Sequence, residues 1–201
     1  GCGGIEDPRT AEIASVIARA DEPLLRTRPG LVAGKYAMMA ADPYAFFRGT
    51  VPLFLHDFVA NREGLSASRF ALSTPLVLSL GDAHVENFGA LIAADGSHGL
   101  EPNDFDGADR TVYLWDVRRL AIAMALGARL SNTEDPAARA AAVSAARGIA
   151  FAAALSYAGE MRALAGGAAG VRVDDPEGSP VLEDLFERSR RDADSRAELD
   201  D

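Results

Sequence analysis

The chain has 201 residues, of which 48% are hydrophobic and 25% charged, and this is enough apolar material for one substantial core. Its net charge of −10 argues against a nucleic-acid-binding domain, which normally carries a basic face. Cys2 is the single cysteine, which excludes an internal disulfide and a cysteine-based zinc site, and no run approaches the ~20 consecutive apolar residues of a membrane span.

Two aspartate-proline pairs predict where the first helices start. Asp7-Pro8 and Asp42-Pro43 each combine an N-cap aspartate with a proline at the first helical position. We expect a break between the first helix and the next over residues 23–30, and a helix over residues 31–41. The helix that starts at Asp42-Pro43 should continue to residue 58, and Pro52 can kink it.

The middle of the chain predicts a small sheet between helices. Residues 76–80 form a short apolar run that is typical of a buried strand, and Asp95-Gly96 between two apolar segments is a strong hairpin signal. Helices are expected over residues 115–130 and from Asp135-Pro136 to about residue 164, followed by a flexible glycine-rich joint at residues 166–170. The predicted fold class is therefore α+β and mostly helical.

We expect three regions: an N-terminal segment and helix over residues 1–30, a central domain over residues 31–165, and a linker with the start of a further region over residues 166–201. Gly1-Cys2, a cysteine preceded by a small residue, matches what remains when a bacterial lipoprotein signal is truncated just short of its cleavage point, where the mature protein would begin at the lipid-bearing cysteine. This predicts an envelope lipoprotein anchored through Cys2. An arbitrary start of the sequence, with a cytoplasmic protein, is the alternative.

The chemistry is concentrated on both sides of the predicted hairpin. Because the two strands of a hairpin are antiparallel, Asn87 before the first strand should lie beside Asp104 at the end of the second. Asp82 precedes Asn87 by five residues across one loop. Oxygen atoms of aspartate and asparagine are the hard ligands that Mg²⁺ prefers, so these side chains predict a metal site at one edge of the sheet.

The spacing is typical of a phosphoryl-transfer catalytic loop. There an aspartate accepts the proton of the substrate hydroxyl, an asparagine five residues later holds a metal, and an aspartate after a hairpin holds metal on the phosphates. These are the roles predicted for Asp82, Asn87 and Asp104, with Asp106 as a second acidic metal ligand. The alternative is that these residues are turn formers, since Gly-Asp and Asn-Asp are common in turns.

Three motifs resemble the aminoglycoside phosphotransferase and choline kinase group: Gly81-Asp82-x-His84-x-x-Asn87, Asp104-Phe105-Asp106 and Trp115-Asp116-Val117. The resemblance implies that Asp116 braces the catalytic loop from a helix start. Leu80 departs from the group, which usually has histidine there. We expect His84 to hold the loop by hydrogen bonds rather than to act as a base.

A second resemblance spans about residues 31–130 and is carried by five motifs in order. The chain resembles the bacterial domain-of-unknown-function family 2252 in Lys35-Tyr36-x-x-Met39, Phe46-Phe47-Arg48-Gly49, Gly81-Asp82-Ala83-His84-x-x-Asn87-Phe88-Gly89, Asn103-Asp104-Phe105-Asp106 and Trp115-Asp116-Val117-Arg118-Arg119-Leu120. Members of that family resemble kinases and are about twice as long, with a Gly-rich segment and a lysine strand after the acidic motifs. The sequence lacks that part, so we expect a fragment with the catalytic loop of a kinase-like lobe but without the Gly-rich nucleotide lobe.

Two basic residues complete the candidate site. Arg48 can contact phosphate or substrate, because arginine binds anions with two parallel hydrogen bonds, or it can pair with a carboxylate on a helix surface. Lys35 is the only lysine and is the second basic candidate. Glu86 is an accessory candidate for the metal.

We therefore predict a Mg²⁺-dependent, ATP-using phosphotransferase. The short connection at residues 107–114 favours a small-molecule acceptor over a protein. One alternative is a catalytically inactive kinase-like binding or scaffold protein of the envelope, where ATP is scarce, and another is a metal-dependent hydrolase.

Overall fold

The structure is a computed structural model that describes residues 7–68, 76–93, 95–127, 135–170, 172–175 and 178–200, with side chains up to residue 192. The predicted lipid anchor at Cys2 lies outside the described residues. The helices are α1 Pro8–Thr27, α2 Pro29–Ala41, α3 Pro43–Gly49, α4 Val51–Val59, α5 Leu114–Gly127, α6 Pro136–Ala165 and α7 Pro180–Asp200. The strands are β1 Val77–Ser79, β2 Phe88–Ile92, β3 His98–Pro102 and β4 Asp109–Thr111. The mostly helical α+β class is confirmed.

The aspartate-proline signals correctly place three helix starts. The side chains of Asp7, Asp42 and Asp135 each accept a backbone hydrogen bond from the first turn of α1, α3 and α6. The expected break at residues 23–30 is wrong in extent, because α1 continues through Pro23 and ends at Thr27. Pro23 lies on an exposed face, where water can serve the carbonyl group that the proline leaves unbonded.

The single helix predicted from Asp42-Pro43 to residue 58 is two helices. Thr50 separates α3 from α4 with non-helical backbone angles, and its hydroxyl donates to the carbonyl oxygen of Phe46 at 2.7 Å. Pro52 lies in the first turn of α4 and does not kink a continuous helix. A missing N–H costs no helical hydrogen bond at that position, which is why the proline is tolerated there.

The strands form two small antiparallel sheets, one with β1 beside β4 and one with β2 beside β3. The predicted hairpin is confirmed: Phe88 pairs with Pro102 at its base and Ile92 with His98 near its tip. The prediction that the strand at residues 76–80 is buried is wrong for its large side chains, since Leu76 and Leu78 are exposed. Ser79 is buried, so β1 presents only one face to the interior.

An aromatic cluster ties α4 to the start of α5. Phe54 and Phe58 pack against Leu114 and Trp115, and the ring of Trp115 meets that of Phe54 edge-on at 4.8 Å. This cluster lies directly beneath the loop that follows β1, because the Trp115 indole nitrogen donates to the carbonyl oxygen of Gly81 at 2.6 Å.

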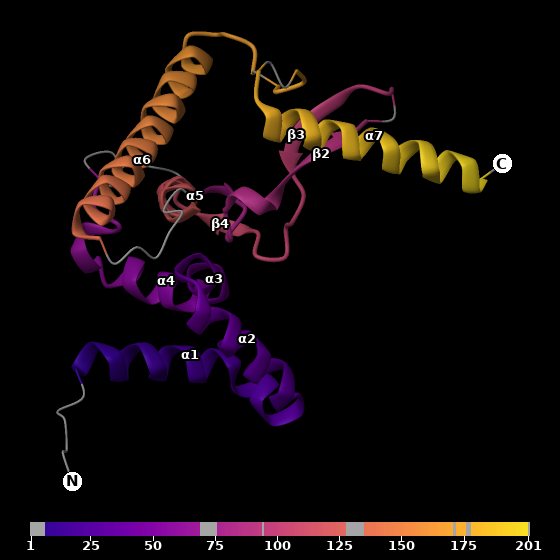
Figure 1. The fold of residues 1–201 in the computed structure, drawn as a ribbon. Helices are drawn as coiled ribbons and strands as arrows, with labels where there is room; N and C mark the ends of the chain where they lie inside the picture. Colours follow the sequence, from indigo (N-terminus) through magenta and orange to yellow (C-terminus); the bar gives the residue numbers. More distant parts are fainter. Residues whose placement is uncertain are drawn as a thin grey trace.

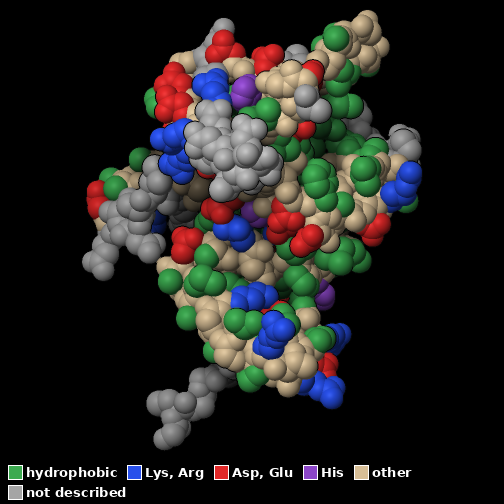
Figure 2. Space-filling model, turned by 90° about the vertical axis from the view of Figure 1, so that its right-hand side faces the viewer, with side chains coloured by type: hydrophobic (Ala, Val, Ile, Leu, Met, Phe, Trp, Pro, Cys, Tyr) green, Lys and Arg blue, Asp and Glu red, His purple; other side chains and the backbone are tan. Residues whose placement is uncertain are grey.

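The last two helices cover different parts of the molecule (Figure 1). α6 runs beside α5, with Tyr113 and Tyr157 stacked at 5.9 Å, and by length and composition it is the one described helix that could cross a membrane. α7 lies across the β2–β3 hairpin, where Phe186 is fully buried. On the face shown in Figure 2, acidic and basic side chains are interspersed among apolar ones.

Candidate functional site

The candidate site begins where β1 ends, at Gly81, a position where any other residue would be strained. Gly81 has a φ of +79°, and a Cβ atom on it would lie 1.8 Å from the carbonyl oxygen of Gly107. A Cβ on Gly107 would in turn approach the backbone nitrogen of Asp82 at 3.4 Å. The loop that carries Asp82 and the loop that follows Asp104 therefore run against each other in backbone contact.

Asp116 fixes the start of the Asp82 loop from the first turn of α5. Its two carboxylate oxygens accept hydrogen bonds from the backbone nitrogens of Leu80, at 2.7 Å, and Gly81, at 3.1 Å. Together with the bond from Trp115 to the Gly81 carbonyl, these contacts hold both polar groups of the Gly81 backbone. The helix start thus determines where Asp82 begins its turn.

Asn87 joins the segment between β1 and β2 that carries Asp82 (the Asp82 loop) to the segment between β3 and β4 that carries Asp104 and Asp106 (the acidic loop). Its side-chain nitrogen donates to the backbone carbonyl of Asp82 at 2.9 Å, and its own carbonyl accepts from the backbone nitrogen of Asn103 at 3.1 Å. Asn87 is buried, whereas Asp104 and Asp106 are exposed. Asp104 accepts a hydrogen bond from the Asp106 backbone at 3.2 Å, which closes a tight turn.

The carboxylate of Asp82 is bound on one side by a residue that the sequence analysis did not single out. Arg119 of α5 donates to Asp82 Oδ1 from Nε at 2.7 Å and approaches the same oxygen with Nη2 at 2.6 Å. Arg119 is fully buried, while 28% of the Asp82 side chain is exposed. The other carboxylate oxygen, Oδ2, lies 3.8 Å from His84 Nε2.

A signal for Arg119 was present in the helical spacing. Trp115, Arg119 and Ala123 follow each other at four-residue intervals, and all three are buried on one face of α5. Its neighbour Arg118 points elsewhere and donates to the carbonyl oxygen of Ala67 at 3.0 Å. Burial lowers the pKa of the Arg119 guanidinium, against the opposing effect of the Asp82 charge.

His84 lies near Oδ2 of Asp82, the oxygen that Arg119 does not bind, and it contacts Arg48. His84 is buried, and its Nε2 accepts a hydrogen bond from Arg48 Nε at 3.4 Å, so the proton of the neutral ring belongs on Nδ1. Burial lowers the pKa of His84, which keeps the ring uncharged at neutral pH. Arg48 also forms an ion pair with Glu86, and both of those side chains are largely exposed.

Lys35 takes a different position from the other candidates. Its ammonium group pairs with both carboxylate oxygens of Asp21 at 2.8 and 2.9 Å, which ties α2 to α1. Asp21 is buried, so this charge has its partner within the N-terminal helices. Arg48 therefore contacts the Asp82 loop, whereas Lys35 is bound to the carboxylate of Asp21.

The acidic residues give few protein ligands for a metal. Among the described residues, no three histidine, cysteine, aspartate or glutamate side chains are grouped to hold an ion. Asn87 and Asp104 lie on adjacent loops, and Asp106 is close to Asp104 in sequence. Mg²⁺ commonly uses only one or two carboxylates and completes its shell with water and phosphate oxygens, so Asn87 and Asp104 are the residues that could hold such an ion.

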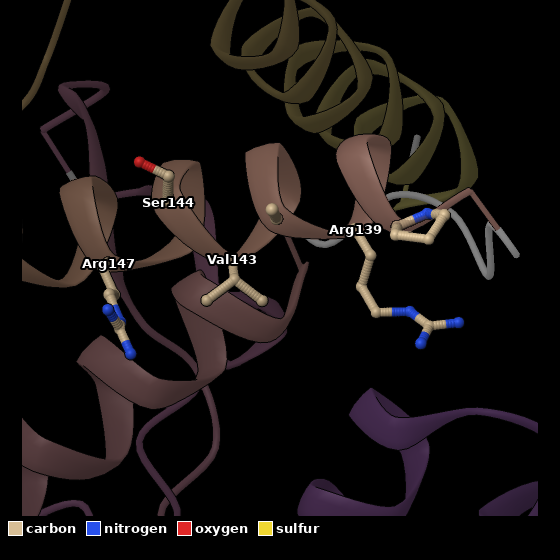
Figure 3. Close-up of a pocket in the computed structure, with 6 residues that line it drawn as sticks. Arg139, Val143, Ser144 and Arg147 are labelled. Carbon is tan, nitrogen blue, oxygen red and sulfur yellow. The ribbon is translucent and has the colours of Figure 1, made fainter.

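A pocket outside this region lies on the N-terminal part of α6 (Figure 3). Arg139, Val143 and Arg147 project from one side of the helix and Ser144 from the other. None of the predicted site residues lines it.

Comparison with known families connects these loops to a group of bacterial proteins. A family model described as "Uncharacterized protein conserved in bacteria (DUF2252)" matches residues 26–200. The chain belongs to this family. The match includes the Asp82 loop, the acidic loop and α5, and it confirms the resemblance drawn from the five motifs. No curated protein and no solved structure matches the chain.

Proposed function

We propose that the chain carries the catalytic loop of a Mg²⁺-dependent, kinase-like phosphotransferase that acts on a small molecule. The observation that carries the proposal is the pair of hydrogen bonds made by Asn87. One joins its side chain to the Asp82 backbone, and the other joins its backbone to Asn103, next to Asp104. These contacts bring the loop of the proposed base and the loop of the proposed metal ligand to one edge of the hairpin.

Asp82 is suited to the role of the base that receives the hydroxyl proton. Its Oδ1 is occupied by Arg119, and its Oδ2 faces His84 at a distance longer than a hydrogen bond. A substrate hydroxyl that approaches the exposed part of Asp82 can therefore donate to Oδ2. The neutral His84 ring does not compete as an ion-pair partner for that oxygen.

Asn87 and Asp104 would hold Mg²⁺ together with nucleotide phosphates, and Asp106 would add an acidic ligand. The side-chain nitrogen of Asn87 is used by Asp82, which directs its amide oxygen away from that carbonyl and leaves it as a ligand atom. A bound Mg²⁺ would neutralise charge on the phosphate oxygens. Arg48, which contacts His84 and is exposed, can bind phosphate once it releases Glu86.

The alternative function is a kinase-like protein that binds a nucleotide or another ligand without catalysis. The ion pair between Lys35 and Asp21 favours this alternative, because the only lysine of the chain is held on the N-terminal helices. The two functions share the ligand site and differ in whether phosphate is transferred.

The test measures binding of Mn²⁺ with ADP by electron paramagnetic resonance, because Mn²⁺ takes the same oxygen ligands as Mg²⁺ and its free signal falls on binding. We expect Asp104→Asn to weaken ternary binding by at least about tenfold, the loss of one charged ligand. Glu22→Gln, an equal charge change on the exposed side of α1, should bind like the wild type. Equal binding by all three proteins, or no binding by the wild type, would refute the proposal.

A phosphate-transfer assay then separates the two functions. The wild-type chain is incubated with Mg²⁺, ATP and a panel of small alcohols and amino alcohols, and phosphorylated products are followed by ³¹P NMR. Transfer that is lost in Asp82→Asn supports the phosphotransferase. Asp104-dependent binding without transfer supports the binding protein only when the assay is repeated on a protein that includes the Gly-rich nucleotide lobe, because a catalytic loop without that lobe is not expected to transfer phosphate.

A further inference from the structure

Arg119 is an unusual residue to find at the centre of this site, because it is a fully buried cation. Transfer of a guanidinium group from water to the interior costs free energy that its partner seldom repays in full, and replacing buried ion pairs by apolar residues is often neutral or stabilising. Stability alone therefore gives little reason to retain an arginine here. Its contacts point to a role in orienting Asp82.

The surroundings of Arg119 fix its plane and its position. The guanidinium lies over the rings of Phe47, at 4.4 Å, and Phe54, at 5.2 Å, and Nη2 donates to the Phe47 carbonyl oxygen at 3.2 Å. These contacts with Phe47 and Phe54 hold the guanidinium independently of Asp82. Phe47 also precedes Arg48, so the same contact joins α5 to the helix that carries the exposed cation of the site.

The geometry at Asp82 divides its two oxygens. Both Nε and Nη2 of Arg119 approach Oδ1, instead of taking one oxygen each as in the parallel two-bond pairing that arginine commonly forms. Oδ2 is left on the side of His84. One oxygen is therefore held by Arg119, and the other receives no hydrogen bond from the described residues.

We infer that Arg119 is a positioning residue that locks Asp82 in one rotamer and selects Oδ2 as the oxygen that receives the substrate hydroxyl. The role of Oδ2 rests on the proposed phosphotransferase function. The lock itself follows from the contacts of Arg119 and can be tested without a known substrate.

The experiment compares the wild type with Arg119→Met, Arg119→Lys and Arg118→Met by NMR of the folded full chain. The readout is the pair of couplings between Hα and the two Hβ protons of Asp82, which differ strongly for one staggered rotamer and become equal when rotamers interconvert. We expect two distinct couplings in the wild type and in Arg118→Met, which changes the adjacent arginine of the same helix. Arg119→Met should give averaged couplings with the amide spectrum otherwise retained.

Arg119→Lys keeps the charge but loses the planar fork, and we expect couplings between those of the wild type and Arg119→Met. It also serves as the test if Arg119→Met does not fold. Distinct, wild-type-like couplings in both folded Arg119 variants would overturn the inference. Mn²⁺-ADP binding is measured on the same samples. Absence of binding by the wild type refutes the proposed function, whereas the couplings alone decide whether Arg119 fixes the rotamer of Asp82.

Discussion

The substitution Asp82→Asn should destabilise the protein as well as remove the proposed base. The change leaves Arg119 buried without the carboxylate that compensates its charge. The Nη1 atom of Arg119 has no hydrogen-bond partner among the described residues, and the contact from Nη2 to the neutral Phe47 carbonyl does not replace the lost charge. The carboxamide of asparagine can still accept one hydrogen bond, but it carries no charge.

The magnitude follows from the burial of the two partners. Removal of one member of a buried ion pair typically costs about 3–5 kcal/mol. Because the Asp82 side chain is 28% exposed and asparagine retains an acceptor, we expect the lower end, about 3 kcal/mol. For a chain of this length that corresponds to a fall in Tm of about 6–12 °C.

Removal of the other partner, Arg119, should lower the free energy of unfolding by less. Arg119→Met removes the buried cation and places a flexible apolar side chain against the rings of Phe47 and Phe54. Asp82 then keeps its partial exposure to water. We expect a loss of about 1 kcal/mol, and the double variant should be more stable than Asp82→Asn alone.

Thermal and urea unfolding of the three variants measure these differences. The control is Asp109→Asn, an exposed aspartate on β4 whose carboxylate accepts from the backbone nitrogen of its neighbour Arg110. It should change the free energy of unfolding by less than about 0.5 kcal/mol. If Asp82→Asn is as stable as this control, the uncompensated charge of Arg119 does not destabilise the fold and the reasoning fails. A loss of activity in Asp82→Asn is interpretable only beside these measurements.

Three further predictions concern the turn at Gly81, the stability of the protein at acid pH and the packing of α7. Gly81→Ala should cost more than about 1–3 kcal/mol, because a positive φ and a clash with Gly107 act together, and urea unfolding measures it. The pKa of Glu12 is lowered to about 2 by its hydrogen bonds with His56 and Arg9. Its stabilising contribution is therefore complete above about pH 4.5 and is lost as the pH falls toward 2. Over that range the stability of the wild type should fall toward that of Glu12→Gln in acid unfolding curves. Phe186→Ala should cost about 3–5 kcal/mol by leaving a cavity under α7, and faster amide exchange in β2 should accompany it.

The sequence predicted most elements because their signals are local. Asp7-Pro8 and Asp135-Pro136 mark helix starts through capping, and Asp95-Gly96 marks the hairpin through backbone conformation; the structure shows all three features. Pro23 does not end α1, because the cost of a proline depends on whether the lost hydrogen bond is buried. A single sequence does not contain that information.

Contacts between elements that are distant in the sequence could not be predicted from such local signals. An apolar run such as residues 76–80 does not reveal which of its side chains the rest of the chain will cover, and Leu78 is exposed. Nothing in the sequence pairs Lys35 with Asp21 across two helices. Arg119 was within reach, since its four-residue spacing from Trp115 places it on the buried face, but only the fold shows that its partner is Asp82.

The two loops of the candidate site differ in how they are held, and this difference bears on the order of events in the proposed reaction. The Asp82 loop is fixed at each step by Trp115, Asp116 and Arg119. Asp104, in contrast, is exposed, and the described contact of its carboxylate is with the backbone of its own turn. If Asp82 is the base and Asp104 a metal ligand, as proposed, we expect the bound nucleotide and metal to order the acidic loop. Metal affinity should therefore depend strongly on the nucleotide, whereas the geometry of Asp82 should not.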